Sequence, residues 1–174
     1  MFEWIKMSHW QVFTDGSVNT QLKVGYGAYL VVATEDTSKG KVKTTDALKD
    51  KVKIRRFKQT SSTKLELQTL LWALHEIIVL VGKSDTKLTI YTDSQNIIGL
   101  PSRKTSLEQS HYYSSKNKRL NHYELYQEFY RLTSSITCKL VKVSGHQLSS
   151  NKNDKDRLFS LVDKASRRAL RAEF

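Results

Sequence analysis

A change from strand-like to helical periodicity near the middle of the chain restricts the possible folds more than any other feature. Apolar residues recur there at three- and four-residue steps, which predicts an amphipathic helix: Leu67, Leu70, Leu71, Leu74, Ile77, Ile78 and Val81. Ser62 or Thr63 would cap its beginning, and Gly82 would end it. Strand-like runs lie on either side, at Val52–Phe57 and Lys87–Thr92. A strand, a long helix and another strand imply a parallel crossover connection.

Two further strands are predicted before this unit. Residues 10–15 and Val24–Ala33 are strand-like, and the short polar link between them indicates a hairpin. The segment Glu35–Asp50 is polar and Lys-rich, so we expect a solvated excursion there. Together with Val52–Phe57, the N-terminal part therefore predicts three antiparallel strands.

The C-terminal half contains more helices and one more strand. A short helix is expected at Gln95–Leu100, and the only proline, Pro101, then opens a polar stretch to Lys118 that is predicted to be a loop or partly helical. The remaining predicted elements are a helix at Leu120–Leu132, a strand at Ile136–Val143 and a helix at Asp154–Leu170. The chain shows no internal repeat. We therefore predict an α/β fold, with a mixed sheet flanked by helices, in one domain spanning residues 1–174.

The chain carries a large excess of positive charge. Lys and Arg total 29 against 17 Asp and Glu, which gives a formal net charge of +12 over 174 residues. This balance is typical of nucleic-acid-binding proteins. It would also suit an anionic membrane or an acidic protein, but no basic amphipathic anchor, long apolar span or obligate protein partner is indicated. Cys138 is the only cysteine and the N-terminus has no signal-peptide apolar region, so we expect a soluble, cytoplasmic protein.

Three carboxylates stand at the ends of predicted elements. Asp15 ends the first strand before Gly16, which would permit a sharp turn; Glu66 lies near the start of the long helix, and Asp93 ends the strand that follows it. Mg²⁺ takes oxygen ligands and keeps several waters, so a few neighbouring carboxylates can hold one or two ions. Each residue also has a structural interpretation. Asp15 could be a turn aspartate, Glu66 a capping-box partner of Thr63, and Asp93 the cap of the helix that follows. Their joint occurrence in a basic protein favours a divalent-metal site that faces a polyanion.

Four short motifs follow one another along the chain. They are Thr14-Asp15-Gly16-Ser17, Leu65-Glu66-Leu67, Thr92-Asp93-Ser94-Gln95, and Gly145-His146 followed by an acidic helix. Together they resemble the signature of type 1 ribonuclease H, over about residues 10–171. The resemblance implies a ribonuclease H-like five-stranded mixed sheet flanked by helices. It also implies metal-dependent endonucleolytic hydrolysis of the RNA strand of RNA–DNA hybrids, giving 5′-phosphate and 3′-hydroxyl ends.

The resemblance further implies roles for individual residues. Asp15, Glu66 and Asp93 would be catalytic ligands of two Mg²⁺ ions, with Mn²⁺ as a substitute, and His146 would be a mobile general acid/base or a product-release group. Two ions about 3.5 to 4 Å apart can activate a water and stabilise the leaving oxygen. Two alternatives stay open: a non-cleaving nucleic-acid-binding module, and another nuclease of the same superfamily.

A fourth carboxylate normally lies on the last helix of this family, and two aspartates compete for that place. Asp156 lies ten residues after His146, which is similar to the family spacing, and Asp163 lies seven residues further on, nearly two turns away on the same face. Family members have a small residue three positions after this aspartate, so that the helix can lie close to the sheet. Ser166 meets that condition for Asp163, whereas Phe159 stands at this position after Asp156. We predict that Asp163 is the fourth catalytic and metal-binding carboxylate.

Hydroxyl and amide groups beside the carboxylates are candidates for contact with a hybrid, which is recognised through phosphates and 2′-hydroxyls. The substrate-binding candidates are Gly16, Ser17, Ser61, Ser62, Thr63 and Gln95. After Pro101, two tyrosines and several cations form a basic segment: Arg103, Lys104, Tyr112, Tyr113, Lys116, Lys118 and Arg119. It resembles the substrate-handling segment of some family members, and its structural alternative is a solvated charged loop.

Overall fold

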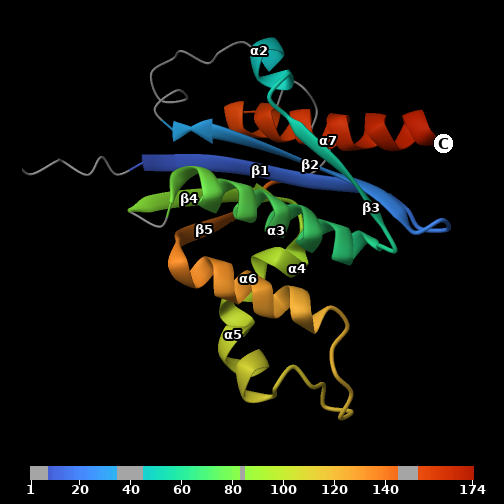
Figure 1. The fold of residues 1–174 in the computed structure, drawn as a ribbon, viewed down its shortest axis with the longest axis vertical. Coiled ribbons are helices and arrows are strands. Elements are labelled where there is room, and N and C mark those ends of the chain that lie inside the picture. Colours follow the sequence, from blue (N-terminus) through green and yellow to red (C-terminus); the bar gives the residue numbers. More distant parts are fainter. Residues whose placement is uncertain (1–7, 35–44, 83–84, 145–152) are drawn as a thin grey trace, which may run out of the picture.

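A five-stranded sheet with helices on both faces forms the centre of the computed structural model, which describes residues 8–34, 45–82, 85–144 and 153–174 (Figure 1). The strands are β1 (Ser8–Asn19), β2 (Val24–Ala33), β3 (Lys53–Lys58), β4 (Thr86–Thr92) and β5 (Thr137–Lys142), in the order β3-β2-β1-β4-β5. β2 pairs antiparallel with β1 and β3, whereas β4 pairs parallel with β1 and β5. The predicted mixed sheet, hairpin and crossover are confirmed.

The first strand is longer than the sequence indicated. We expected β1 to end at Asp15, but it continues in register with β2 as far as Asn19. The turn comes later, where the Asn19 side chain accepts two backbone N–H bonds and Lys23 adopts a φ of 54°. Gly16 pairs with Gly27 inside the sheet, so the prediction of a sharp turn at Gly16 was wrong.

The long helix α3 (Ser62–Val81) begins and ends close to its expected limits. Ser61 is the N-cap, one residue earlier than expected, and its side chain accepts a hydrogen bond from the backbone N–H of Lys64. Gly82 ends the helix with a φ of 69°, a conformation that glycine adopts at little cost. Because Lys64 occupies the third helical position, Glu66 is not part of a capping box.

Glycines in the hairpin allow α3 to lie very close to the sheet. A Cβ added to Gly27 would lie 2.1 Å from the hydroxyl oxygen of Thr69, and one added to Gly16 would lie 2.9 Å from the side chain of Leu65. Both distances are too short for a carbon atom, so a larger residue would displace the side chain of Thr69 or Leu65 or the helix that carries them. The glycines therefore set how near the first turns of α3, with Glu66, approach β1.

Separate apolar cores lie on the two faces of the sheet. On one face, α3 lies on β1 and β2, and α6 (Tyr123–Ser135) packs against α3 and β5. On the other face, α7 (Asp154–Glu173) crosses β1 and β2 (Figure 1). Side chains of β1 alternate between the cores, with Val12 in the α3 core and Phe13 in the α7 core. Asp15 has the parity of Phe13 and therefore belongs to the α7 face.

The polar stretch after Pro101 begins as a helix. α4 (Gln95–Ile98) follows β4, and α5 (Leu100–Gln109) carries Pro101 in its first turn, where the missing N–H of proline costs no helical hydrogen bond. Residues 110–122 then form a loop in which Tyr113 and Arg119 make one isolated bridge. The prediction of a partly helical segment is therefore correct for its first half.

A short helix, α2 (Thr45–Lys49), interrupts the expected solvated excursion. Its Leu48 is buried with Leu30 and Val32 in the α7 core. One buried leucine in an otherwise charged segment was too weak a pattern to predict this helix.

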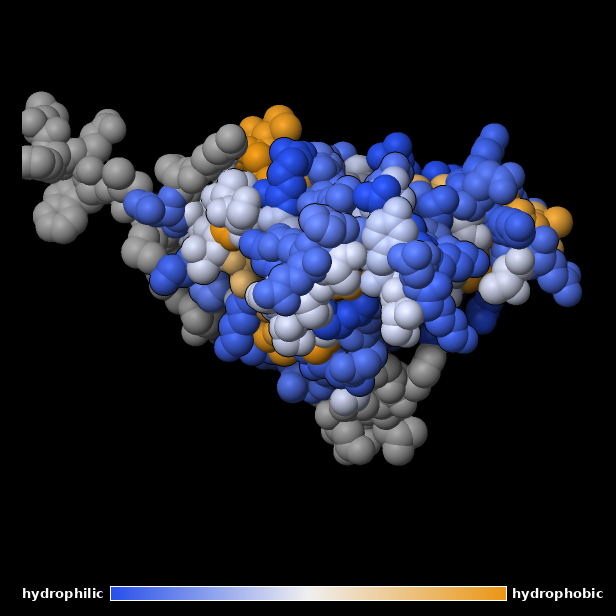
Figure 2. Space-filling view, turned by 90° about the horizontal axis from the view of Figure 1, so that it is seen from below, coloured by the Kyte–Doolittle hydropathy of each residue, from blue (hydrophilic) through white to orange (hydrophobic). Residues whose placement is uncertain are grey.

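The surface seen from the side of α5 and the loop 110–122 is mostly hydrophilic, with small apolar patches between charged side chains (Figure 2). Among the helices of the four described ranges, none combines the length and apolarity needed to cross a bilayer.

Candidate active site

Parallel pairing of β1 and β4 brings Asp15 and Asp93 together. Phe13 pairs with Tyr91 across the two strands, and their rings stack with centroids 4.8 Å apart. Asp15 lies two residues after Phe13 in β1. Asp93 lies two residues after Tyr91, just beyond the end of β4. Because side chains alternate along strands, the two carboxylates continue the row that the stacked rings begin.

Asp15 is a strongly perturbed carboxylate of this group. Burial raises its pKa, the charges of Asp93 and Asp163 raise it further, and so does a hydrogen bond to the side chain of Asp163. The backbone N–H of Gly16 opposes these effects, but the pKa still reaches about 8. At neutral pH the cluster therefore retains a proton when no cation balances it.

The last helix supplies Asp163, and not Asp156, to this cluster. Asp163 interacts with Asp15 directly, and its Oδ1 also accepts a 2.8 Å bond from the Nε of Arg167. Asp156 instead completes a capping box with Asn153 at the beginning of α7. Ser166, three residues after Asp163, is completely buried, which fits the small side chain expected where the helix lies close to the sheet.

Glu66 reaches the cluster from α3. Burial raises its pKa and the charge of Asp93 does so too, while a 2.5 Å hydrogen bond from the hydroxyl of Ser94 lowers it. Ser94 is also the N-cap of α4, accepting from the backbone N–H of Ile97. The N-cap of α4 is therefore Ser94, whereas the structural interpretation of Asp93 was a helix cap. Ser94 was predicted to have no role beyond its place in the motif, although its position before a predicted helix was a signal for an N-cap.

The carboxylates interact in pairs rather than as one tight set. Asp15 is hydrogen-bonded to Asp163 and interacts with the charge of Asp93, and the charge of Asp93 also acts on Glu66. Within the described residues, no three His, Cys, Asp or Glu side chains are close enough in their present positions to hold a single ion. The donor chemistry nevertheless fits Mg²⁺, because all four groups offer carboxylate oxygens and the charge that raises the pKa of Asp15 is the charge a cation would offset. His146, the remaining catalytic candidate, lies outside the described residues.

The substrate-binding candidates fall into two groups. Ser61, Ser62 and Thr63 are exposed around the N-terminus of α3. Ser61 and Thr63 line an open hollow of about 370 Å³ with Arg103, Leu120, Asn121, His122 and Tyr126. Neither Asn121 nor His122 was predicted to have a role, since no pattern along the sequence links this loop with α3.

The other candidates lie close to the carboxylates and already have protein partners. Ser17 makes a 3.1 Å hydrogen bond with Ser166 of α7. Gln95 accepts a 2.7 Å bond from the ammonium group of Lys142 on β5. Gly16 lies beneath Leu65. These three residues are therefore engaged in the protein fold around the acidic cluster.

Several cations of the basic segment are stacked on aromatic rings. The Cζ of Arg103 lies 5.8 Å from the ring centroid of Tyr126, and the Nζ of Lys104 lies 5.9 Å from the ring centroid of Tyr130. Arg119 lies 3.8 Å from the centroid of Tyr123. Such stacking holds a cation in place without neutralising it. These ring contacts distinguish this part of the segment from a freely solvated loop, although Lys104 and Arg119 are exposed, as are Lys116 and Lys118.

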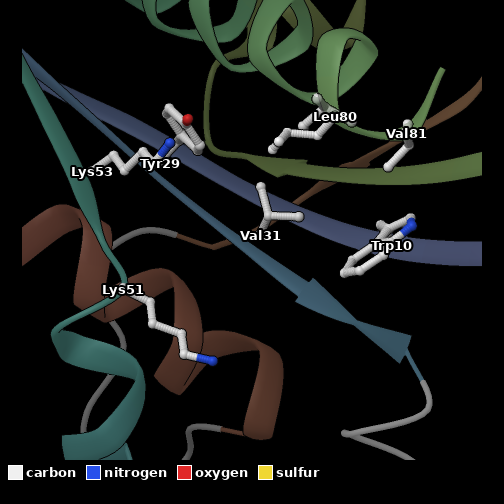
Figure 3. A pocket seen from close by; sticks show the side chains of 8 residues that line it. Trp10, Tyr29, Val31, Lys51, Lys53, Leu80 and Val81 are labelled. Carbon is white, nitrogen blue, oxygen red and sulfur yellow. The ribbon is translucent and has the colours of Figure 1, made fainter.

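A more apolar hollow of about 360 Å³ lies between the end of α3 and the beginning of β1 (Figure 3). It is lined by Trp10, Tyr29, Val31, Lys51, Lys53, Ile77, Leu80 and Val81. The lining contains no carboxylate, so its chemistry differs from that of the acidic cluster.

Comparison with known proteins identifies both a family and a shared fold. The sequence matches the family model described as RNase H over residues 7–167. LC9-RNase H1, a type 1 RNase H with the type 2 active-site motif, is similar with a TM-score of 0.68 at 14% identity, over 96% of this chain and 74% of that one.

Two similar structures are of the foamy viral protease-reverse transcriptase. The complex with an RNA/DNA hybrid gives a TM-score of 0.63 at 8% identity, over 93% of this chain and 20% of that one. The complex with dsDNA gives a TM-score of 0.59 at 12% identity, over 95% of this chain and 98% of that one. At these identities the likeness shows the fold alone. No curated protein sequence matches this chain significantly.

Proposed function

The chain belongs to the RNase H family, and from that premise we propose that it is an endoribonuclease that hydrolyses the RNA strand of RNA–DNA hybrids. The observation that carries this proposal is that Asp15 interacts electrostatically with Asp93 and Asp163 and is also hydrogen-bonded to the side chain of Asp163. Acidic side chains brought together at partial burial are unfavourable unless cations balance them. In a protein of net charge +12, such a local acidic group is suited to metal ions that also bind a phosphate.

We assign Asp15, Glu66, Asp93 and Asp163 as ligands of two Mg²⁺ ions, with Mn²⁺ as a substitute. The ions would supply an activated water for in-line attack and stabilisation of the leaving oxygen, which gives 5′-phosphate and 3′-hydroxyl ends. We retain His146 as the general acid/base or product-release group on the basis of the sequence motif alone.

Neighbouring groups orient the carboxylates of Glu66, Asp163 and Asp15. Ser94 is fixed as the cap of α4 and donates to Glu66, Arg167 donates to Asp163, and the Gly16 N–H donates to Asp15. The bonds to Glu66 and Asp15 favour the ionised carboxylate, which is the form that binds a cation. The protein thus offsets part of the unfavourable charge repulsion at Asp15 before any ligand arrives.

The hollow beside the N-terminus of α3 is our candidate for the nucleic-acid backbone. Ser61 and Thr63 line the same hollow as Arg103, whose guanidinium lies over the ring of Tyr126 and donates to the side-chain oxygen of Asn96. Hydroxyls beside a cation can bind a phosphate or a 2′-hydroxyl. A hybrid has phosphates on both strands and 2′-hydroxyls on its RNA strand only. Lys104 and Arg119 extend the basic surface from this hollow along α5 and the loop 110–122.

The decisive experiment supplies four labelled substrates, an RNA–DNA hybrid, an RNA duplex, a DNA duplex and single strands, with Mg²⁺ or with EDTA. The proposal expects cleavage of the RNA strand of the hybrid only, and none in EDTA. Binding of the hybrid without cleavage would indicate a non-cleaving binding module. Cleavage of the other substrates would indicate a different nuclease of the superfamily, and cleavage in EDTA would exclude the metal mechanism.

A further inference from the structure

A chain of hydroxyl groups connects β1 with the backbone of Asp163. The Oγ of Ser17 lies 3.1 Å from the Oγ of Ser166, and the Ser166 hydroxyl lies 3.0 Å from the carbonyl oxygen of Asp163, to which it donates. A serine hydroxyl has one proton, so Ser17 must be the donor in the bond with Ser166. Ser17 therefore donates its hydroxyl proton to Ser166 and not to a ligand.

This chain runs beside the contact between Asp15 and Asp163. Ser17 follows Asp15 by two residues, so both side chains are on the same face of β1. Ser166 follows Asp163 by three residues, so it lies next to Asp163 on the surface of α7. Two adjacent contacts between one strand and one helix restrict sliding as well as rotation of the helix, which a single contact would not do.

The hydroxyl pair also distinguishes between the two possible positions of α7. If the helix were displaced by seven residues so that Asp156 replaced Asp163, Phe159 would stand where Ser166 now lies. Phe159 has no hydroxyl to accept from Ser17 and is much larger than serine. Ser166 is completely buried, so its hydroxyl would lose its sheet partner without Ser17.

We propose that Ser17 and Ser166 are positioning residues that hold Asp163 against Asp15 and thereby complete the metal site. This proposal rests on the proposed function, and it replaces the substrate contact expected of Ser17. Groups that orient metal ligands typically contribute about 10- to 100-fold to metal affinity or activity. We therefore expect Ser17→Ala and Ser166→Ala each to lower kcat about 10-fold, with KM for the hybrid within about twofold of wild type.

The test measures kcat, KM and Mg²⁺ affinity by calorimetry for both alanine variants, the double variant and Ser17→Thr. Residues that act as one unit have non-additive effects, so the double variant should lose no more than either single variant. Ser17→Thr keeps the hydroxyl and should restore most of the activity. Glu173→Gln is the matched control, because it weakens bonds from α7 to Arg56 and Tyr26 without touching the cluster, and it should leave Mg²⁺ affinity unchanged.

The outcomes separate this proposal from the proposed function. An Mg²⁺ affinity lowered about tenfold in both alanine variants supports the positioning role, even if wild type cleaves no hybrid and the proposed function fails. A raised KM for Ser17→Ala alone, with Ser166→Ala normal, would assign Ser17 to the substrate and overturn the proposal. Unchanged Mg²⁺ affinity in both alanine variants, or additive losses in the double variant, would overturn it as well.

Discussion

Glu76 and Asp15 are carboxylates with opposite surroundings on opposite faces of one sheet. Glu76 of α3 accepts a 2.8 Å bond from Lys53, a bond from the hydroxyl of Tyr29 and a 2.8 Å bond from the indole N–H of Trp72. These donors lower the pKa of Glu76 to about 2, whereas burial and neighbouring acids raise the pKa of Asp15 to about 8. The residue type is nearly the same, so the partners decide the difference.

The contrast distinguishes a carboxylate that stabilises the fold from one that is available for catalysis. Glu76 joins β2, β3 and α3, and its charge is balanced within the protein. The negative charge of Asp15, by contrast, is repelled by the negative charges of Asp93 and Asp163. A group whose charged form is unfavourable in the folded protein is a candidate for a functional role.

The largest expected effect is on catalysis. Asp15→Asn, Glu66→Gln and Asp93→Asn should each lower kcat/KM on a labelled hybrid at least about a thousandfold, because amides keep the shape but lose the charge that holds a cation. Glu76→Gln, the matched change in the balanced carboxylate, should stay within about twofold of wild type. Circular dichroism would verify the fold of each variant. Near-normal turnover in any of the first three would remove that residue from the site.

The two aspartates of α7 should differ next most strongly. Asp163→Asn should lower turnover about a hundredfold, since Asp163 contacts Asp15. Asp156→Asn should change turnover only a few-fold and instead destabilise the beginning of α7 by about 1 kcal/mol, because it loses its capping box. Steady-state kinetics with Mg²⁺ and urea unfolding measure both quantities. The reverse order of turnover would place Asp156 in the site.

Stability should respond with opposite signs to the two neutralising changes. Glu76→Gln loses charge-assisted hydrogen bonds at a partly exposed site and should lower the free energy of unfolding by about 1 kcal/mol. Asp15→Asn relieves repulsion and should raise that free energy at pH 8.5 in EDTA. Urea unfolding at equilibrium gives both values. If both substitutions destabilise equally, Asp15 is not strained by its neighbours.

Stability should also depend on pH differently at the two carboxylates. The pKa of Asp15 is raised, so its stabilising contribution is complete below about pH 4 and is lost as the pH rises to about 8. The pKa of Glu76 is lowered, so its contribution is present above about pH 4.5 and is lost as the pH falls to about 2. The free energy of unfolding is measured against pH for wild type and for each neutralised variant. The difference between the two curves gives the pH dependence contributed by that carboxylate. A flat difference profile for Asp15→Asn between pH 4 and 8 would contradict this assignment.

Much of the fold could be predicted from the sequence because buried faces impose regular spacing on apolar residues. That regularity gave the five strands, the crossover and α3. It did not give the end of β1, since Gly16 and Gly27 are needed for the close approach of α3 and not for a turn. It also missed α2, whose single buried residue is Leu48.

The candidate site was predictable only where its residues lie in local motifs. Asp15, Glu66 and Asp93 stand at recognisable places, and the demand for a small residue favoured Asp163 over Asp156. The bonds of Ser94 to Glu66 and of Ser17 to Ser166 join residues 28 and 149 positions apart. Such contacts depend on how distant elements pack, and no spacing rule along the chain contains that information.

The central claim is that the acidic cluster around Asp15 is completed by divalent cations, and the most direct test is the effect of Mg²⁺ on the free energy of unfolding at pH 8.5. Binding to the folded protein alone should raise this free energy in wild type by about 1.4 kcal/mol at ten times the dissociation constant. Glu76→Gln should keep that increase, and Asp15→Asn should lose it. An equal increase in Asp15→Asn, or none in wild type, would contradict the claim.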